Sequence, residues 1–553
     1  MTFNFKNYAD ELLFVPLGGS NEIGMNLNLY SYKGKWLMID LGIGFADAYL
    51  PGVEIILPDI EFITQHKKDL LGLVLTHAHE DHLGAVPYLW DELQCPVFAT
   101  PFTHAVLKAK LADEGITSKI PVTEVHPGQK IQLAPFEFEM IPLTHSIPEM
   151  QAVALRTDKG VVMHTGDWKL DPDPLVGPVT DEATLKKYGD EGVLAMVCDS
   201  TNVFVDGESG SEAGVRDSLA EIITGCKNRV VVTTFASNIA RLESIIRAGQ
   251  KAGRHIAIAG RSLRRITTAA KESGYLQDAA PFLSEREVND VAKSDILLIC
   301  TGCQGEPMAA LSKISRGEHP SIRLTPGDTV IFSSRKIPGN ESRVAHIYNA
   351  LTQRGMEIIT SKRHHVHVSG HPARGELTRM YQLVRPKIAI PTHGEPRHIH
   401  EHAKLARSLQ VPETVEAKNG SVILLAEGRA LEVGTVPSGY VAVDGNSLIP
   451  ITSSIIKTRR KIRDDGCTIV FVVLSKDNEL LSPPRICAPG CMDANDDKDL
   501  LIALREEITA ALERAKPKDT VDRLSESIRT AMRQFFRAEL GKKPVIEVHV
   551  VKL

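Results

Sequence analysis

Residues 71–82 read Leu-Gly-Leu-Val-Leu-Thr-His-Ala-His-Glu-Asp-His, so an apolar run leads directly into a dense group of potential metal ligands. The apolar half of this stretch is typical of a buried strand that ends in a loop. The loop then carries the imidazoles of His77, His79 and His82 and the carboxylate of Asp81. This arrangement predicts a metal site at the mouth of a β-sheet, and a metallohydrolase as the class of protein.

Three more potential ligands lie farther along the chain, each just past an apolar run: His145, Asp167 and His393. With the first four, they supply enough nitrogen and carboxylate ligands for two adjacent divalent metals. Such a pair polarises a phosphoryl oxygen and generates hydroxide at neutral pH. An isolated histidine is most often structural, and we interpret His164 in that way.

The spacing divides these ligands into two sets that share one carboxylate. Side chains two residues apart in an extended segment point the same way, whereas the end of the motif needs a turn to face a neighbouring point. The first set is His77, His79 and His145, and the second set is Asp81, His82 and His393. We expect Asp167 to bridge the two metals, and Asp40, at the end of a strand, to orient a ligand histidine.

Length and composition limit the class of protein. At 553 residues the chain is too long for one hydrophobic core, so about three domains are expected. The net charge of −5 gives no global attraction to nucleic acid, but a metal pair and a local basic groove would supply it. The eight cysteines are scattered, and we interpret them as reduced thiols. Without a signal-like or membrane-length apolar segment, we expect a cytoplasmic protein with no membrane contact.

The pattern of secondary structure along the chain changes at about residue 213. Short apolar strands dominate the first part, and from about residue 213 strands and helices alternate, as in 229–234 followed by 239–251. This alternation predicts a parallel sheet in a separate α/β block. Because His393 has to join ligands more than 200 positions upstream, we interpret the block as an insertion into the first domain. The active site is then expected in the cleft between them.

The C-terminal part contains a basic cluster at residues 457–463, which we interpret as part of a linker. After it, the pattern predicts a small α+β domain with a strand at 467–474, helices at about 497–515 and 519–540, and a final strand at 545–551.

The ligand motif resembles the HxHxDH signature of the metallo-β-lactamase superfamily. Three further segments resemble motifs of its β-CASP branch, which acts on nucleic acids: residues 198–202 with Asp199, residues 367–371 with His371, and residues 391–395 with His393. Within this branch, nearly the whole chain resembles the ribonuclease J family, including residues 17–24, 235–238, 302–307 and 334–340.

This resemblance implies an α/β fold: a metallo-β-lactamase αββα sandwich with an inserted α/β β-CASP domain and a small C-terminal α+β domain. The expected boundaries are 1–212 and 364–446 for the two parts of the metallo-β-lactamase domain, 213–363 for the β-CASP domain, 447–464 for the linker and 465–553 for the C-terminal domain.

The resemblance also implies a ribonuclease that holds two Zn²⁺, with Mn²⁺ or Mg²⁺ as substitutes. It would degrade single-stranded RNA from a 5′-monophosphate end in the 5′-to-3′ direction and also cut internally, in RNA decay and maturation. A homodimer or homotetramer and contacts with other RNA-decay proteins are the expected partners. Residues 44–52 and 443–447 differ from the more acidic loops of the family, so a structural Ca²⁺ is doubtful.

Catalysis is assigned by the resemblance to His371 and Asp199, together with Asp81 and Asp167 of the metal centre. His371 is expected to contact the phosphoryl oxygen in the transition state or to protonate the leaving 3′-oxygen, with Asp199 orienting it or a metal-bound group. The residues expected at the substrate and its 5′-phosphate are Phe235, Ser237, Asn238, His367, Val368, Ser369, Gly370 and His371. A strand-to-helix turn at 237–238 favours a phosphate, although an ordinary helix N-cap explains the same residues.

Three alternatives stay open at this point. The first is another hydrolase on the same scaffold, such as a thioesterase or lactonase, which the inserted block and His371 argue against. The second is a DNA nuclease or an RNA 3′-end-processing endonuclease, which contacts to the 2′-OH would distinguish. The third is an RNA-binding subunit with an inactive site, which is disfavoured because all seven proposed ligands are present.

Overall fold

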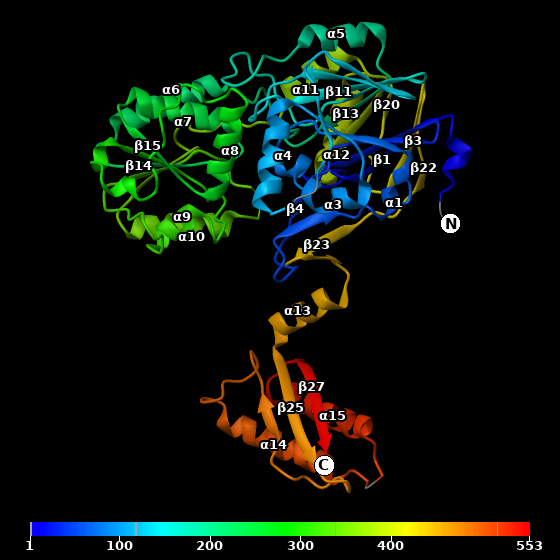
Figure 1. The fold of residues 1–553 in the computed structure, drawn as a ribbon, viewed down its shortest axis with the longest axis vertical. Helices are drawn as coiled ribbons and strands as arrows, with labels where there is room; N and C mark the ends of the chain where they lie inside the picture. The colour runs from blue at the N-terminus through cyan, green and yellow to red at the C-terminus, as the bar shows by residue number, and fades with distance from the viewer. Residues whose placement is uncertain (1–2, 117–118, 338, 517) are drawn as a thin grey trace. The chain divides into compact units, whose positions relative to one another are not determined.

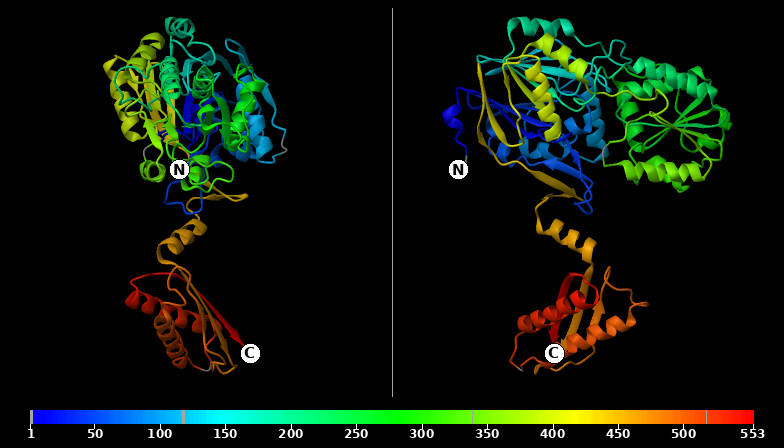
Figure 2. Two further views of the ribbon diagram at one scale, coloured as in Figure 1. Left: turned by 90° about the vertical axis from the view of Figure 1, so that its left-hand side faces the viewer. Right: turned by 180° about the vertical axis from the view of Figure 1, so that it is seen from behind.

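The structure is a computed structural model that describes residues 3–116, 119–337, 339–516 and 518–553. The chain forms two compact units, the first comprising residues 1–44 and 57–439, and the second residues 45–56 and 440–553. Figures 1 and 2 show the elements of each unit, coloured along the chain. Within the described ranges, no helix is both long enough and apolar enough to span a membrane.

Two β-sheets pack face to face in the first unit. The first has the order β22-β21-β1-β2-β3-β6-β7-β8, and the second β20-β19-β13-β12-β11-β10-β9. The first sheet comprises β22 (Arg429–Thr435), β21 (Ser421–Ala426), β1 (Leu12–Gly18), β2 (Leu27–Tyr32), β3 (Lys35–Ile39), β6 (Leu70–Val74), β7 (Val97–Ala99) and β8 (Val122–Glu124). The second comprises β20 (Glu413–Thr414), β19 (Ile388–Thr392), β13 (Ala195–Asp199), β12 (Gly160–His164), β11 (Gln151–Thr157), β10 (Phe136–Pro142) and β9 (Lys130–Leu133).

Alternating side chains on the strands fill two separate cores. On β12, Val162 points into the core between the sheets, whereas Val161 and Met163 point to the opposite face, because successive side chains on a strand alternate. That opposite face is covered by three helices, α5 (Glu182–Glu191), α11 (Arg374–Val384) and α12 (Pro396–Ser408). The remaining α-helices of the sandwich are α1 (Glu61–Thr64), α2 (Glu80–Leu83), α3 (Val86–Leu93) and α4 (Pro101–Asp113). The result is the αββα sandwich expected from the sequence.

A five-stranded parallel sheet, in the order β15-β16-β14-β17-β18, is inserted between β13 and β19. Its strands are β14 (Val230–Thr233), β15 (His255–Ala259), β16 (Ile296–Cys300), β17 (Thr329–Phe332) and β18 (Glu357–Thr360). Its helices are α6 (Glu212–Gly225), α7 (Ile239–Lys251), α8 (Arg261–Glu272), α9 (Ala310–Arg316) and α10 (Glu341–Gln353). Figure 1 shows α6 and α7 on one face of this sheet and α9 and α10 on the other. The predicted strand–helix alternation is therefore present.

The second unit contains two smaller sheets. One has the order β24-β23-β5-β4, with β4 (Gly44–Phe45), β5 (Ile55–Pro58), β23 (Tyr440–Asp444) and β24 (Ser447–Pro450). The other has the order β26-β25-β27, with β25 (Cys467–Leu474), β26 (Arg485–Cys487) and β27 (Val545–Lys552), and packs against α14 (Lys498–Glu513) and α15 (Val521–Glu539). The basic cluster lies on a helix, α13 (Ser454–Asp465), whose first turn is capped by the Ser453 hydroxyl.

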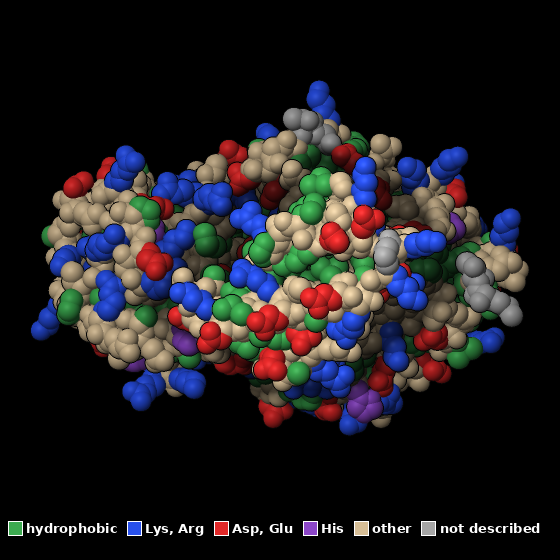
Figure 3. All heavy atoms as spheres, turned by 90° about the horizontal axis from the view of Figure 1, so that it is seen from below, with side chains coloured by type: hydrophobic (Ala, Val, Ile, Leu, Met, Phe, Trp, Pro, Cys, Tyr) green, Lys and Arg blue, Asp and Glu red, His purple; other side chains and the backbone are tan. Residues whose placement is uncertain are grey.

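Charged side chains are mixed over the surface that Figure 3 presents, with Lys and Arg interspersed among Asp and Glu. This pattern agrees with a chain of small net charge. The field of the whole molecule therefore gives no general attraction to a polyanion, and any such contact would depend on local groups.

The ring of Phe138 holds the two sheets together and should dominate their packing energy. Phe138 is fully buried on β10, and its ring lies 5.5 Å from that of Phe98 on β7 of the facing sheet. Phe138→Ala is expected to lower the free energy of unfolding by about 3–5 kcal/mol, because it leaves a cavity between the sheets. Denaturant unfolding, followed by the fluorescence of the buried Trp36 and Trp168, measures the change. Met308→Ala is the control: its side chain is 72% exposed, so the free energy of unfolding should change by less than about 0.5 kcal/mol.

Candidate metal centre and active site

The carboxyl ends of neighbouring strands place the ligands at one edge of the sandwich. Strands β12, β13 and β19 are adjacent and parallel, so the segments that follow them meet at the same edge. Asp167 follows β12, Asp199 ends β13, and His393 follows β19. In the facing sheet, β3 and β6 are also parallel, and they are followed by Asp40 and by the segment 75–82. Within this segment His77 and His79 lie in a loop, whereas Asp81 and His82 lie on helix α2. A crevice beyond the carboxyl ends of parallel strands is a common ligand site.

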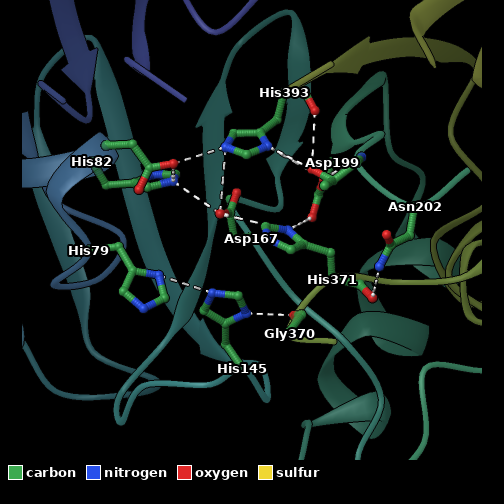
Figure 4. A network of polar contacts seen from close by, with 12 residues as sticks. His79, His82, His145, Asp167, Asp199, Asn202, Gly370, His371 and His393 are labelled. Carbon is green, nitrogen blue, oxygen red and sulfur yellow. Dashed lines mark hydrogen bonds and ion pairs between the residues drawn. The ribbon is translucent and has the colours of Figure 1, made fainter. Parts of the chain in front are cut away.

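The first ligand set forms a tight cluster of ring nitrogens. Nδ1 of His79 lies 3.0 Å from Nε2 of His77 and 3.1 Å from Nε2 of His145. With a carboxylate oxygen of Asp167, these ligand atoms all lie within 4.8 Å of one another. Figure 4 shows His79 and His145 pointing toward the same space below Asp167. Such a set is able to hold one metal ion.

The second ligand set lies on the other side of Asp167. Nε2 of His393 is 3.2 Å from Oδ2 of Asp81, and Nε2 of His82 is 3.2 Å from Oδ2 of Asp167. These four residues again have ligand atoms within 4.8 Å of one another. Asp167 is thus common to both sets.

The burial of these groups fits a metal centre. Oδ1 of Asp167 is buried and has no hydrogen-bond partner among the residues that the structure describes, as expected for an oxygen that faces a cation. Burial lowers the pKa of His77 and His145 well below its ordinary value, and that of His79 to about 4. These imidazoles are therefore neutral at pH 7, which is the form that binds metal.

Several ligands are held by partners outside the two sets. Oδ2 of Asp40 lies 2.7 Å from Nδ1 of His82, a position from which it orients this ring. The carbonyl oxygen of Gly370 lies 2.6 Å from Nδ1 of His145. A Cβ atom at position 370 would lie 2.8 Å from Cε1 of the same ring, so a larger residue would displace His145.

His371 and Asp199 form a pair beside the second ligand set (Figure 4). Nδ1 of His371 is 2.8 Å from Oδ2 of Asp199. Burial lowers the pKa of His371, but the carboxylates of Asp199 and Asp167 outweigh it and raise the pKa above its ordinary value. The raised pKa favours the protonated ring, which is the form that a general acid requires.

Family models match most of the chain in four segments. The ribonuclease J β-CASP domain matches residues 227–351, and the ribonuclease J C-terminal domain matches residues 454–553. The Zn-dependent metallo-hydrolase RNA specificity domain matches residues 356–418, and the metallo-beta-lactamase superfamily matches residues 26–184.

Ribonuclease J of Sinorhizobium meliloti is 42% identical over 552 residues, which are 98% of this chain and 98% of that protein. The chain belongs to the ribonuclease J family. Ribonuclease J of Corynebacterium glutamicum is 36% identical over 99% of this chain and 76% of its own length. Ribonuclease J of Thermus thermophilus is 33% identical over 97% of this chain and 94% of its own length.

A crystal structure of a protein of unknown function from Enterococcus faecalis V583 shares the fold, with a TM-score of 0.53 and 15% identity. The match covers 75% of this chain and all of that one. Family membership confirms the resemblance and the three-part architecture seen in the sequence. It identifies the chain as a metal-dependent ribonuclease and excludes the thioesterase and lactonase alternatives.

The predicted 5′-phosphate residues of this ribonuclease J family member fall into two groups. Asn238, Val368 and Ser369 line one small cavity together with His145 and Lys169. The other group does not line this cavity and comprises Phe235, Ser237, His367, Gly370 and His371. The Asn238 side chain accepts the backbone N–H of Arg241, so it also caps helix α7, which is the competing interpretation of this turn.

Four polar residues beside the site were not found from the sequence. Asn202 donates to Ser369 Oγ (2.7 Å) and to the His371 carbonyl (3.0 Å), so it fixes the loop that carries His371. Lys169 is buried against Asp171. The other two are Thr76, whose hydroxyl contacts Nδ1 of His77, and Thr201, whose hydroxyl contacts Nδ1 of His393. Thr76 lies inside the stretch 71–82, Thr201 and Asn202 lie inside the segment 198–202, and Lys169 lies two residues after Asp167. Position in or beside a motif was the signal that the sequence offered.

His79→Ala tests the first ligand set. The variant is expected to hold about one metal ion per chain fewer than wild type, because the first set loses one of its three ring nitrogens and the remaining ligands are not arranged around the vacated position. Elemental analysis of the purified variant gives the metal content. The matched control is His104→Ala, whose partly exposed ring pairs with Glu124 outside the site. Equal metal content in the His79 variant and wild type would exclude this ligand set.

Proposed function

We propose that this chain is a two-zinc ribonuclease that hydrolyses single-stranded RNA in the 5′-to-3′ direction from a 5′-monophosphate end. Internal cleavage is proposed as a second activity. The observation that supports this function is the pair of ligand sets that share the buried carboxylate of Asp167, beside the His371–Asp199 pair.

Zinc is the proposed metal because imidazole and carboxylate ligands in sets of this size suit it, with Mn²⁺ or Mg²⁺ as substitutes. When bound, two such cations neutralise charge on the phosphoryl oxygens and supply hydroxide at neutral pH. Asp167 holds the two sites at a fixed separation. Oδ2 of Asp81 lies 3.2 Å from Nε2 of His393, so both ligand atoms face the second site.

His371 is the proposed general acid. Its Nδ1–H is engaged by Asp199, which leaves Nε2 to donate a proton to the leaving 3′-oxygen. Asp199 is fully buried and its Oδ1 accepts two hydrogen bonds from Thr201. The carboxylate is therefore rigidly placed, and so is the imidazole that it orients.

The cavity beside His145 is the proposed 5′-phosphate pocket. Its lining includes the Asn238 amide, the Ser369 hydroxyl and the Lys169 ammonium, which are groups that donate hydrogen bonds to a phosphate. The carboxylates of Asp171 and Glu212 line it as well, and Lys169 is paired with Asp171, so a phosphate has to compete with that ion pair. The cavity has a volume of about 10 Å³, about that of one water molecule, so its lining has to move apart before a phosphate enters. We propose that this opening takes one phosphate and not three. It would also place the first phosphodiester bond near the metals.

The remaining parts of the proposal rest on the resemblance to the family. They are the domain boundaries given above, a cytoplasmic location, a homodimer or homotetramer, contacts with other RNA-decay proteins, and a role in RNA decay and maturation. A structural Ca²⁺ is not part of the proposal.

The direction of cleavage is tested with RNA of one sequence that carries either a 5′-monophosphate or a 5′-triphosphate. We expect mononucleotides to accumulate from the first substrate and not from the second, because the pocket accepts a single phosphate. A time course resolved on a denaturing gel measures the products. DNA of the same sequence serves as the control for the sugar. Long fragments from both RNA substrates, without mononucleotides, would contradict the directional proposal.

His371→Ala separates acid catalysis from metal binding. The variant is expected to lose about 100- to 10,000-fold in kcat, because the leaving oxygen departs without a proton donor. Its metal content should equal that of wild type. The two quantities are measured by single-turnover kinetics and elemental analysis. Because His371 also lies within ligand distance of Asp167 and His393, loss of a metal ion in this variant would reassign it as a ligand.

A further inference from the structure

Two aspartate–threonine pairs beside the metal centre have the same hydrogen-bond arrangement, although they come from different sheets. The first pair is Asp40, directly after β3, and Thr76, two residues after β6. The second pair is Asp199, the last residue of β13, and Thr201, two residues farther along. In each pair the carboxylate accepts both the backbone N–H and the hydroxyl of its threonine, and the pair contacts two histidines.

In the first pair, Thr76 donates its backbone N–H to Oδ1 of Asp40 (2.8 Å) and its hydroxyl to Oδ2 (2.9 Å). Oδ2 of Asp40 also lies 2.7 Å from Nδ1 of His82. The hydroxyl oxygen of Thr76 lies 3.0 Å from Nδ1 of His77. The pair is fully buried, so water does not compete for these bonds.

In the second pair, Thr201 donates both its backbone N–H (2.8 Å) and its hydroxyl (2.7 Å) to Oδ1 of Asp199. Oδ2 of Asp199 lies 2.8 Å from Nδ1 of His371. The hydroxyl oxygen of Thr201 lies 2.8 Å from Nδ1 of His393. Figure 4 shows Asp199 between the rings of His371 and His393.

The hydrogen count decides the tautomer of all four histidines. A threonine hydroxyl has one hydrogen and accepts through its lone pairs. Because each hydroxyl gives its hydrogen to the carboxylate, its oxygen remains only as an acceptor for a histidine. An ionised carboxylate is an acceptor as well. Each ring must therefore carry a proton on Nδ1, which leaves Nε2 to face the metals or the substrate.

Backbone conformation at these positions is also unusual. Asp40 and His393, each the first residue after its strand, have φ angles of 62° and 53°. The left-handed region is unfavourable for a residue other than glycine and is held only where the surroundings fix it. The hydrogen bonds of the two pairs, together with the backbone bonds of these residues, supply that restraint.

We propose that Thr76 and Thr201 are positioning residues of the two metal sites. Thr76 sets the tautomer and orientation of His77 in the first ligand set. Thr201 does the same for His393 in the second set and, through Asp199, supports His371. This inference rests on the proposed function, since the hydroxyls have this role only if both sets hold cations. Partners of this kind change metal affinity or activity by about 10- to 100-fold when removed.

The test compares Thr201→Val, which removes the hydroxyl, with Thr201→Ser, which keeps it. Thr267→Val is the matched control, because the buried hydroxyl of Thr267 bonds only to the backbone of helix α8. The bound Zn²⁺ per chain is measured during titration with a chelator. We expect Thr201→Val to lose one ion at a chelator concentration about 10- to 100-fold lower than wild type requires. Thr201→Ser and Thr267→Val should retain both ions.

Thr76→Val supplies an independent second variant. It is expected to weaken retention of the first ion, because the Thr76 hydroxyl contacts His77, and Thr76→Ser should restore it. The rate of RNA cleavage should fall and recover together with the metal content in both series.

Two outcomes would overturn the inference while leaving the proposed function intact. One is wild-type retention of both ions in Thr201→Val and Thr76→Val. The other is a serine variant as defective as the valine variant, which would make side-chain shape responsible. By contrast, a wild-type chain that cleaves RNA with no bound zinc or other divalent metal would overturn the proposed function itself.

Discussion

The buried carboxylate of Asp167 is the constraint on which the active site depends. Burial by itself would raise the pKa of this group, but His393 and His82 lower it well below its ordinary value, so the carboxylate is ionised. An ionised group in a protein interior is costly unless positive charge lies beside it. One of its oxygens contacts these rings and the other has no hydrogen-bond partner within the described part of the chain. The surrounding imidazoles, and cations in the two ligand sets, would stabilise this buried negative charge.

The fold brings the groups around Asp167 together at the ends of neighbouring strands. Because β12, β13 and β19 run parallel and side by side, three short segments after them converge without long loops. The β-CASP domain is inserted between β13 and β19, which leaves their pairing intact and returns the chain at the loop that carries His371. A large α/β domain is thereby added beside the metals with no change to the sandwich core.

Much of this arrangement was predictable from the sequence. Period-two alternation predicts strands such as β10, the repeated strand–helix pattern predicts the β-CASP sheet, and the spacing of ligands in the segment 75–82 predicts two sets. The contacts that orient the ligands were not predictable. Thr201 beside His393, or the Gly370 carbonyl beside His145, depends on chain crossings that no local pattern encodes. The helical character of the basic cluster was also missed, because its one buried apolar residue, Ile456, gives little periodic signal.

The close approach of Gly370 to His145 has a mechanical consequence. The carbonyl of Gly370 holds one nitrogen of a ring whose other nitrogen belongs to the first ligand set, with no room for a side chain between them. The neighbouring Ser369 lines the cavity proposed for the RNA terminus. Any displacement of the segment 369–371 would therefore also displace the ring of His145, because the space between them is filled. The wall of the cavity and the position of a ligand ring are in this way mechanically coupled.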